Sequence, residues 1–236
     1  MGTTSSQSPG TEPGQIAFFD LDRTITGTVS GRLLVTGAYR KGLMKTSDIL
    51  KALWLSSAYK LQLRDPVSIM DDMIKWVKGI ELSDFEHLCS GVSGKALFPS
   101  VYSEARAEIE LHRRNKVSTV LLSSTVCQIC ARVAELLQMD DFICSRLEVS
   151  DGRLTGSAIG SLCYGEEKAV RLREYCEKNN TPVSKAWYYG DSISDLPALL
   201  TAGNPVCVNP DRKLEREARS RHWKICRWKE LISSQE

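Results

Sequence analysis

The sequence lacks a strong excess of either charge, a long apolar run and a second group of paired metal-binding residues. Its 31 Lys and Arg residues nearly balance 29 Asp and Glu residues, so a net charge of +2 gives no reason to expect a nucleic-acid partner. No stretch reaches the ~18 consecutive apolar residues that would cross a bilayer, so we expect no membrane span. A signal peptide is also missing, and we expect a cytoplasmic protein.

The eight cysteines are irregularly spaced, and we expect reduced, buried thiols of an intracellular protein. Cys127 and Cys130 form a CxxC pair, but a zinc site would need a second pair and the three histidines are isolated. The apolar residues around this pair recur with helical spacing. We therefore predict that the pair packs in the core.

Residues 1–14 contain almost nothing that could be buried, so we predict a disordered tail. Their first six residues also fit the Met-Gly-x-x-x-Ser pattern of N-myristoylation at Gly2, an alternative that a Gly/Ser/Thr-rich tail matches easily.

Short apolar runs separated by helical patterns predict buried strands at residues 15–20, 116–124, 185–191 and 204–209. This alternation predicts an α/β fold with a Rossmann-like parallel sheet sandwiched between helices. Two further extended segments flank Asp151-Gly152, which is a hairpin turn signal.

Residues 30–95 interrupt this alternation and have helical patterns throughout. We predict a small helical cap inserted after the first strand, with residues 15–29 and 96–236 forming the core. Asp65-Pro66 predicts the start of one cap helix, and Ser83 with Glu86 predicts a capping box on another.

One apolar stripe of the cap consists of Leu50, Leu53, Trp54, Ala58 and Leu61. We expect this stripe to pack against the other cap helices. A face that lies on a membrane surface is the alternative.

Acidic residues follow two of the predicted strands. Asp20 and Asp22 follow the first strand, and Asp191 and Asp195 follow the strand that begins at Lys185. The carboxyl ends of parallel strands meet at the crevice where such sheets bind ligands, so these carboxylates should converge. Two charges about 5 Å apart repel by about 3 kcal/mol at an effective dielectric constant near 20, so the cluster needs a cation. Oxygen ligands alone predict Mg²⁺.

Other strand and helix ends supply groups that suit an anion. Ser123, Ser124 and Thr125 end the second strand, before a helix N-terminus. Lys168 falls in the first turn of a helix, where a cation is unfavourable unless an anion lies nearby. Together with the acidic residues, these groups predict a phosphoryl-transfer site.

The sequence resembles phosphatases of the haloacid dehalogenase superfamily, in the branch related to phosphoserine phosphatase. The resemblance rests on four motifs in the family's order: "DLDRT" at residues 20–24, "LLSST" at 121–125, Lys168, and "YYGDSISDLP" at 188–197. It implies a Mg²⁺-dependent hydrolase that acts on a small phosphomonoester through an aspartyl-phosphate.

The resemblance also implies roles for individual residues. Asp20 would be the nucleophile and Asp22 the general acid and base. The metal site would be formed by Asp20, the backbone carbonyl of Asp22, and Asp191. Ser123 and Lys168 would bind the phosphoryl oxygens, with Ser124 beside them.

The resemblance implies supporting roles for two further residues. Thr24 would support the loop after the first strand. Asp195 would pair with Lys168 or hold a metal-bound water, or would simply be an acidic residue at a helix N-terminus. A phosphotransferase using the same intermediate and a catalytically silent binding protein are alternative functions, and the sequence gives no oligomeric state.

The sequence departs from phosphoserine phosphatases at Val29, where those enzymes carry a glutamate that binds the substrate amine. We therefore expect phosphoserine to be a poor substrate. Arg32 lies nearby and would favour an anionic or polyol substrate, but it could equally be a surface residue. We expect Arg23 to point away from the site.

Overall fold

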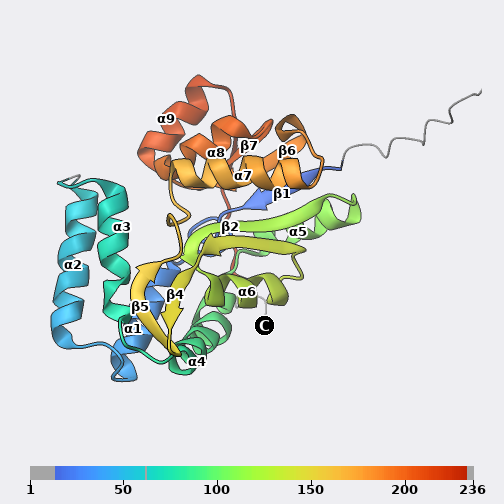
Figure 1. Ribbon diagram of the computed structural model, residues 1–236. Coiled ribbons are helices and arrows are strands. Elements are labelled where there is room, and N and C mark those ends of the chain that lie inside the picture. Colours follow the sequence, from blue (N-terminus) through green and yellow to red (C-terminus); the bar gives the residue numbers. More distant parts are fainter. Residues whose placement is uncertain (1–13, 62, 233–236) are drawn as a thin grey trace, which may run out of the picture.

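The computed structural model describes residues 14–61 and 63–232, which form an α/β fold around one parallel sheet (Figure 1). The six strands lie in the order β3-β2-β1-β6-β7-β8, and each neighbouring pair is parallel. Their bounds are β1 Ile16–Phe19, β2 Ser118–Val126, β3 Asp141–Ser145, β6 Ala186–Gly190, β7 Asn204–Val208 and β8 Lys224–Cys226. The predicted parallel sheet is confirmed. Residues 1–13, which include the acylation pattern and all of the predicted tail except Gly14, lie outside the described residues.

Helices cover both faces of this sheet (Figure 1). One face carries α7 (Glu166–Lys178), α8 (Leu196–Thr201) and α9 (Arg212–Ser220), and the other carries α5 (Ser103–Arg114) and α6 (Cys127–Leu136). Because side chains alternate along a strand, Phe18 packs in the hydrophobic cluster on the side of α7, α8 and α9, and Phe19 packs in the cluster on the side of α5 and α6. The continuous apolar sequence of β1 therefore reflects burial on both sides.

The segment between β1 and β2 is helical, with the helices α1 Ser30–Arg40, α2 Thr46–Lys60, α3 Pro66–Ile74 and α4 Leu82–Val92. Shorter helical turns follow at Lys75–Val77, Ser93–Leu97 and Phe98–Ser100. Residues of α1 and α4 belong to the same hydrophobic cluster as residues of α6. In contrast, α2 and α3 pack on each other through Leu55, Ile69 and Met73 and project from the body of the protein (Figure 1).

The α2 stripe does not pack as expected. Leu50, Leu53, Trp54 and Leu61 are exposed to solvent, whereas Leu55 faces α3. The predicted packing of the stripe against other cap helices is therefore wrong for these four residues. The physical reason is that α2 packs on α3 through Leu55 and on the main hydrophobic cluster through Ile49 and Ala52, which leaves the side with these four residues uncovered.

The strands β4 (Leu147–Ser150) and β5 (Arg153–Ala158) form the predicted hairpin, whose turn residues Asp151 and Gly152 both have positive φ angles. The hairpin is hydrogen-bonded to the helical segment: Gly79 N donates to Leu154 O at 2.8 Å, and Leu82 N donates to Gly152 O at 2.9 Å. This contact joins two parts of the chain that are distant in sequence.

The starts of two helices test the capping predictions. Asp65 caps α3 as predicted, because its carboxylate accepts a hydrogen bond from Ser68 N, with Pro66 in the first turn. The predicted capping box of Ser83 and Glu86 is wrong, because Glu81 is the N-cap residue and α4 begins at Leu82, which places Ser83 inside the helix. The hairpin carbonyl of Gly152 accepts a hydrogen bond from the first amide of α4 instead.

Two of the eight cysteines are not the reduced thiols that the sequence predicts. Cys127 at the start of α6 and Cys144 in β3 form a disulfide bond, so the prediction of eight reduced thiols is wrong for these two. The other six cysteines are free, and Cys130 is buried in the core as predicted. Among the residues that the structure describes, no helix is both long and apolar enough to cross a membrane.

We predict that Gly203, which joins α8 to β7, is essential for stability. A Cβ atom there would lie 2.1 Å from the backbone oxygen of Ser184, so Gly203→Ala must shift the chain. We expect the free energy of unfolding in urea to fall by about 1–3 kcal/mol. Gly91→Ala, in α4, is the control: its Cβ would meet nothing within 4 Å, so stability should be unchanged or rise. Equal effects of the two substitutions would contradict the prediction.

Candidate active site

The parallel register brings three strand ends to the same edge of the sheet. Phe19 of β1 pairs with Leu121 of β2 on one side and with Tyr189 of β6 on the other. Asp20 follows one residue beyond this level, and its amide donates to Tyr189 O at 2.9 Å. Ser123 and Asp191 each lie two residues beyond it. The three polar residues therefore come from adjacent strands at one edge.

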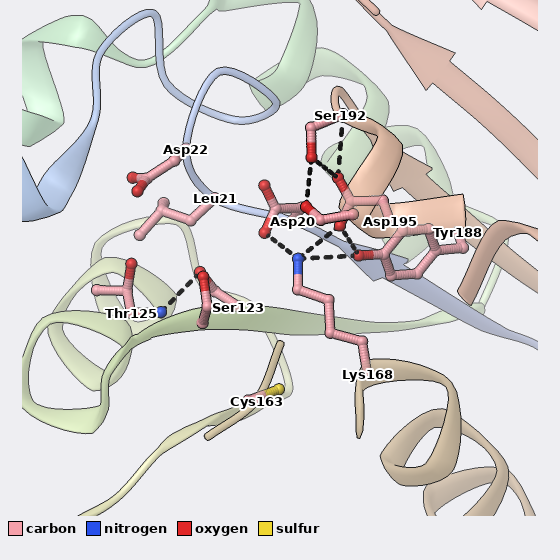
Figure 2. A network of polar contacts seen from close by, with 12 residues as sticks. Asp20, Leu21, Asp22, Ser123, Thr125, Cys163, Lys168, Tyr188, Ser192 and Asp195 are labelled. Atoms are coloured by element: carbon pink, nitrogen blue, oxygen red, sulfur yellow. Dashed lines mark hydrogen bonds and ion pairs between the residues drawn. The ribbon is translucent and has the colours of Figure 1, made fainter. Parts of the chain in front are cut away.

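Lys168 connects two of the acidic residues (Figure 2). Its buried ammonium donates to Asp20 Oδ1 at 2.7 Å and to Asp195 Oδ1 at 2.6 Å. Burial by itself would lower the pKa of Lys168, but the charges of Asp195 and Asp20 outweigh burial and raise this pKa well above its usual value. The lysine is therefore held as a cation beside Asp20.

Asp195 is saturated with hydrogen bonds. Besides Lys168, the hydroxyl of Tyr188 donates to Asp195 Oδ1 at 2.8 Å, and Ser192 N donates to Asp195 Oδ2 at 3.2 Å. Lys168 also donates to the Tyr188 hydroxyl at 3.2 Å. This network fixes the ammonium from the side opposite Asp20 (Figure 2).

Asp20, Asp191 and Asp195 could hold a metal ion, since each offers a carboxylate oxygen and these oxygens lie within 4.8 Å of one another. Three ionised carboxylates and the Lys168 ammonium leave a charge of −2, which a divalent cation would offset. Within the described part of the chain, no hydrogen bond reaches the Asp191 carboxylate. Burial, followed by the charges of Asp20 and Asp195, raises the pKa of Asp191 to about 9. A buried carboxylate in this condition fits Mg²⁺, which prefers oxygen ligands.

Burial also raises the pKa of Asp20, to about 7, against the opposing charge of Lys168. Its second oxygen, Oδ2, accepts no hydrogen bond from the residues that the structure describes. Asp20 thus has one oxygen fixed by Lys168 and one oxygen available for a ligand or for chemistry.

The carboxylate of Asp22 lies apart from this cluster (Figure 2). Its two oxygens accept hydrogen bonds from the amide and the hydroxyl of Ser30, at 2.8 and 2.9 Å, at the first residue of α1. The Ser30 hydroxyl lies 2.6 Å from that of Thr125; because Ser30 gives its proton to Asp22, Thr125 is the donor. Burial raises the pKa of Asp22, and the hydrogen bonds from Ser30 oppose this.

The hydroxyl residues differ in what they contact. Ser123 is buried, and its oxygen accepts a hydrogen bond from Thr125 N at 3.2 Å (Figure 2). The carbonyl of Ser124 accepts one from the Ser145 hydroxyl at 2.8 Å. These bonds fix the backbone of the β2 end beside Asp20.

The Thr24 hydroxyl is buried and has no hydrogen-bond partner among the described residues. The neighbouring Thr26 has the bonds expected of a residue that supports the loop, because its hydroxyl contacts the carbonyls of Leu21 and Thr28 at 3.2 and 3.1 Å. In the structure, the side chain that stabilises this loop by hydrogen bonding is therefore Thr26.

The two arginines near the site are exposed. Arg32 lies in the first turn of α1, outside the buried cluster, and forms no ion pair with any described residue. Arg23 has a positive φ of 63°, and its charge acts on Asp22 and Asp191, where it opposes the rise in pKa that burial causes. The charge of Arg23 therefore acts on the cluster, whereas the role of Arg32 in substrate binding stays a prediction.

Sequence reasoning missed Tyr188, Ser192 and Ser30. Tyr188 lies within an apolar run, where an aromatic residue indicates core packing, and its hydroxyl gives no separate signal. Ser192 follows Asp191 directly, and its Asp195 contact is a local capping box that the S-x-x-D spacing could have predicted. Ser30 carries no motif, and its link to Thr125 spans 95 residues.

Comparisons with known proteins agree with this architecture. Residues 17–200 match the sequence profile of the haloacid dehalogenase-like hydrolase family. The chain is 30% identical to a probable phosphatase of Mycobacterium tuberculosis over 98% of its own length and 82% of that protein. It is 29% identical to a histidinol-phosphatase of Neisseria meningitidis, covering 91% and 99% of the two chains.

Among solved structures, a phosphoserine phosphatase captured with an analogue of its phospho-aspartyl intermediate superposes with a TM-score of 0.70. The match covers 94% of this chain and 97% of that chain, at 15% sequence identity, and indicates a common fold. The matched profile spans β1 through α8, which includes Asp20, Lys168 and Asp191. The chain belongs to the haloacid dehalogenase-like hydrolase family.

Proposed function

We propose that this protein is a Mg²⁺-dependent phosphatase that hydrolyses a small phosphomonoester through an aspartyl-phosphate on Asp20. The observation that carries the proposal is a buried cluster: Asp20 and Asp191 follow the adjacent strands β1 and β6, and Lys168 of α7 forms an ion pair with Asp20. Family membership and relatives named as phosphatases support it.

In the proposed first step, Asp20 Oδ2 attacks phosphorus while Lys168 holds Oδ1. A bond forms between this oxygen and phosphorus as the bond between phosphorus and the leaving oxygen breaks. The ammonium of Lys168 and the strand-end amides after Ser123 offset the negative charge of the phosphoryl oxygens. Tyr188 and Asp195 act as positioning residues, because they hold Lys168 in place.

Asp22 is the proposed proton donor to the leaving oxygen. It then accepts a proton from the water that hydrolyses the aspartyl-phosphate, releasing phosphate and regenerating Asp20. Both Asp22 oxygens are bound by Ser30, so the side chain must exchange these hydrogen bonds for contact with the leaving oxygen.

The residues proposed to hold Mg²⁺ are Asp20, Asp191 and the backbone carbonyl of Asp22. Bound there, the ion supplies positive charge to the phosphoryl group and to the buried carboxylates. Asp195, whose oxygens are occupied by Lys168, Tyr188 and Ser192, acts through Lys168 rather than as a direct ligand.

We further propose that residues 30–95 act as the cap over a core of residues 15–29 and 96–236. The projection of α2 and α3 supports this division. Val29 immediately precedes α1 and Arg32 lies in its first turn, so both residues lie where the chain enters the proposed cap. A cytoplasmic location remains a prediction from sequence.

The nucleophile is tested by Asp20→Asn, which removes the attacking oxygen with little change in size. We expect phosphate release from p-nitrophenyl phosphate to fall by about 10³-fold or more. The matched control is Asp141→Asn, an exposed carboxylate in β3, which should leave the rate unchanged. Turnover by Asp20→Asn within about threefold of the unmodified protein would disprove the mechanism.

The metal site is tested by two measurements. After EDTA treatment and metal-free dialysis, activity should vanish and return with Mg²⁺, whereas Ca²⁺ should inhibit because its looser coordination can engage both Asp20 oxygens. Mg²⁺ alone should raise the melting temperature, since it binds the folded state, and Asp191→Asn should abolish this rise. Full activity in EDTA, or an undiminished rise in the variant, would contradict the assignment.

Specificity is tested with a panel of phosphomonoesters that includes phosphoserine. An ammonium buried in a closed pocket needs a carboxylate partner, and Val29 cannot supply one. We expect kcat/KM for phosphoserine to be at least about tenfold below that of the best substrate. Val29→Glu should narrow this gap. The expectation fails if phosphoserine is the best substrate.

A further inference from the structure

Five large apolar side chains are exposed within a short stretch of the α2–α3 projection. They are Leu50 at 64%, Leu53 at 61%, Trp54 at 56%, Leu61 at 68% and Leu63 at 66% exposure. Isolated exposed apolar residues are ordinary, but a contiguous group marks a surface that contacts something else. We name these five residues the α2 face.

The helical repeat explains why the α2 face is continuous. Residues 50, 53, 54 and 61 fall within about 100° of one another at 3.6 residues per turn. Leu55, on a different side of the same helix, already fills the contact with α3. Ile49 and Ala52 of α2 pack against the main hydrophobic cluster, so the α2 face is an apolar part of this helix that the described protein leaves uncovered.

The α2–α3 projection carries a net positive charge. Residues 40–75 contain seven Lys and Arg residues and four acidic residues, Asp48, Asp65, Asp71 and Asp72. Arg40, Lys41, Lys45 and Lys51 are exposed and form no ion pair with any residue that the structure describes. Of the two acidic residues on α3, Asp72 forms ion pairs with Arg64 and Lys75, and Asp71 forms none with any described residue. The face is therefore complementary to an apolar surface with negative charge.

We propose that the α2 face docks on the surface of a bilayer that contains anionic phospholipid. Leu and Trp side chains would enter the boundary between headgroups and acyl chains, while the surrounding cations contact lipid phosphates. A second copy of this chain fits less well, because a symmetric contact would bring the unpaired cations of both copies together. The protein would thereby bind the surface of a membrane, although no helix among the described residues could cross one.

The test uses the full chain and sedimentation with vesicles of phosphatidylcholine, alone or mixed with phosphatidylglycerol. We expect binding to the mixed vesicles only, and weaker binding at higher salt. The double variant Leu53→Ser/Trp54→Ser should bind at least about tenfold more weakly, because it removes two inserted apolar side chains. Lys45→Gln/Lys51→Gln should also weaken binding.

The matched control is Leu111→Ser/Leu200→Ser, which changes two core-domain side chains of similar exposure, 51% and 50%. It should bind vesicles like the unmodified protein. Unchanged urea midpoints and unchanged p-nitrophenyl phosphate turnover would show that each variant is folded. Three results would overturn the proposal: no binding to mixed vesicles, equal loss in the control, or a dimer in solution that Leu53→Ser/Trp54→Ser dissociates.

Discussion

The buried ammonium of Lys168 is the interaction on which the rest of the site depends. Three carboxylates from the ends of β1 and β6 lie close together out of water, and the lysine of α7 is the cation that the chain itself places among them. Removing one partner of such a buried pair costs about 3–5 kcal/mol, because the other charge remains uncompensated. The same contact joins α7 to β1 and to the turn after β6, so it also fixes the geometry of the sheet edge.

The inserted helical segment is held in two different ways. Buried residues of α1 and α4 share a large hydrophobic cluster with α6. In α2 and α3 the fully buried residues are Leu55 and Ile69, and only partly buried residues, Ile49, Ala52 and Ile74, reach the large cluster. Local stability follows buried apolar contact, so the projecting pair can open at a lower free-energy cost than the helices beneath it. A protein built in this way can adapt its outer helices to ligands while its catalytic edge stays fixed.

Much of the fold and the acidic cluster could be predicted from sequence, because both follow from local patterns. The apolar runs that end in Asp20 and Asp191 predict two strands of the sheet, and the parallel arrangement predicts that both carboxylates lie at the same edge. The charge of Lys168 at the start of a helix indicates that an anionic group lies nearby. Contacts between distant segments leave no such pattern. The Cys127–Cys144 disulfide, the docking of the β4–β5 hairpin on α4 and the Tyr188 hydroxyl depend on how finished elements pack.

The hydrogen bonds from Ser30 make Asp22 part of the N-terminus of α1 as well as part of the loop after β1. Thr125 extends this link to the end of β2. The orientation of the Asp22 carboxylate is therefore coupled to the position of α1. In the proposed mechanism, substitutions that shift α1 would therefore also shift the carboxylate of Asp22 and change the rate of its proton transfer.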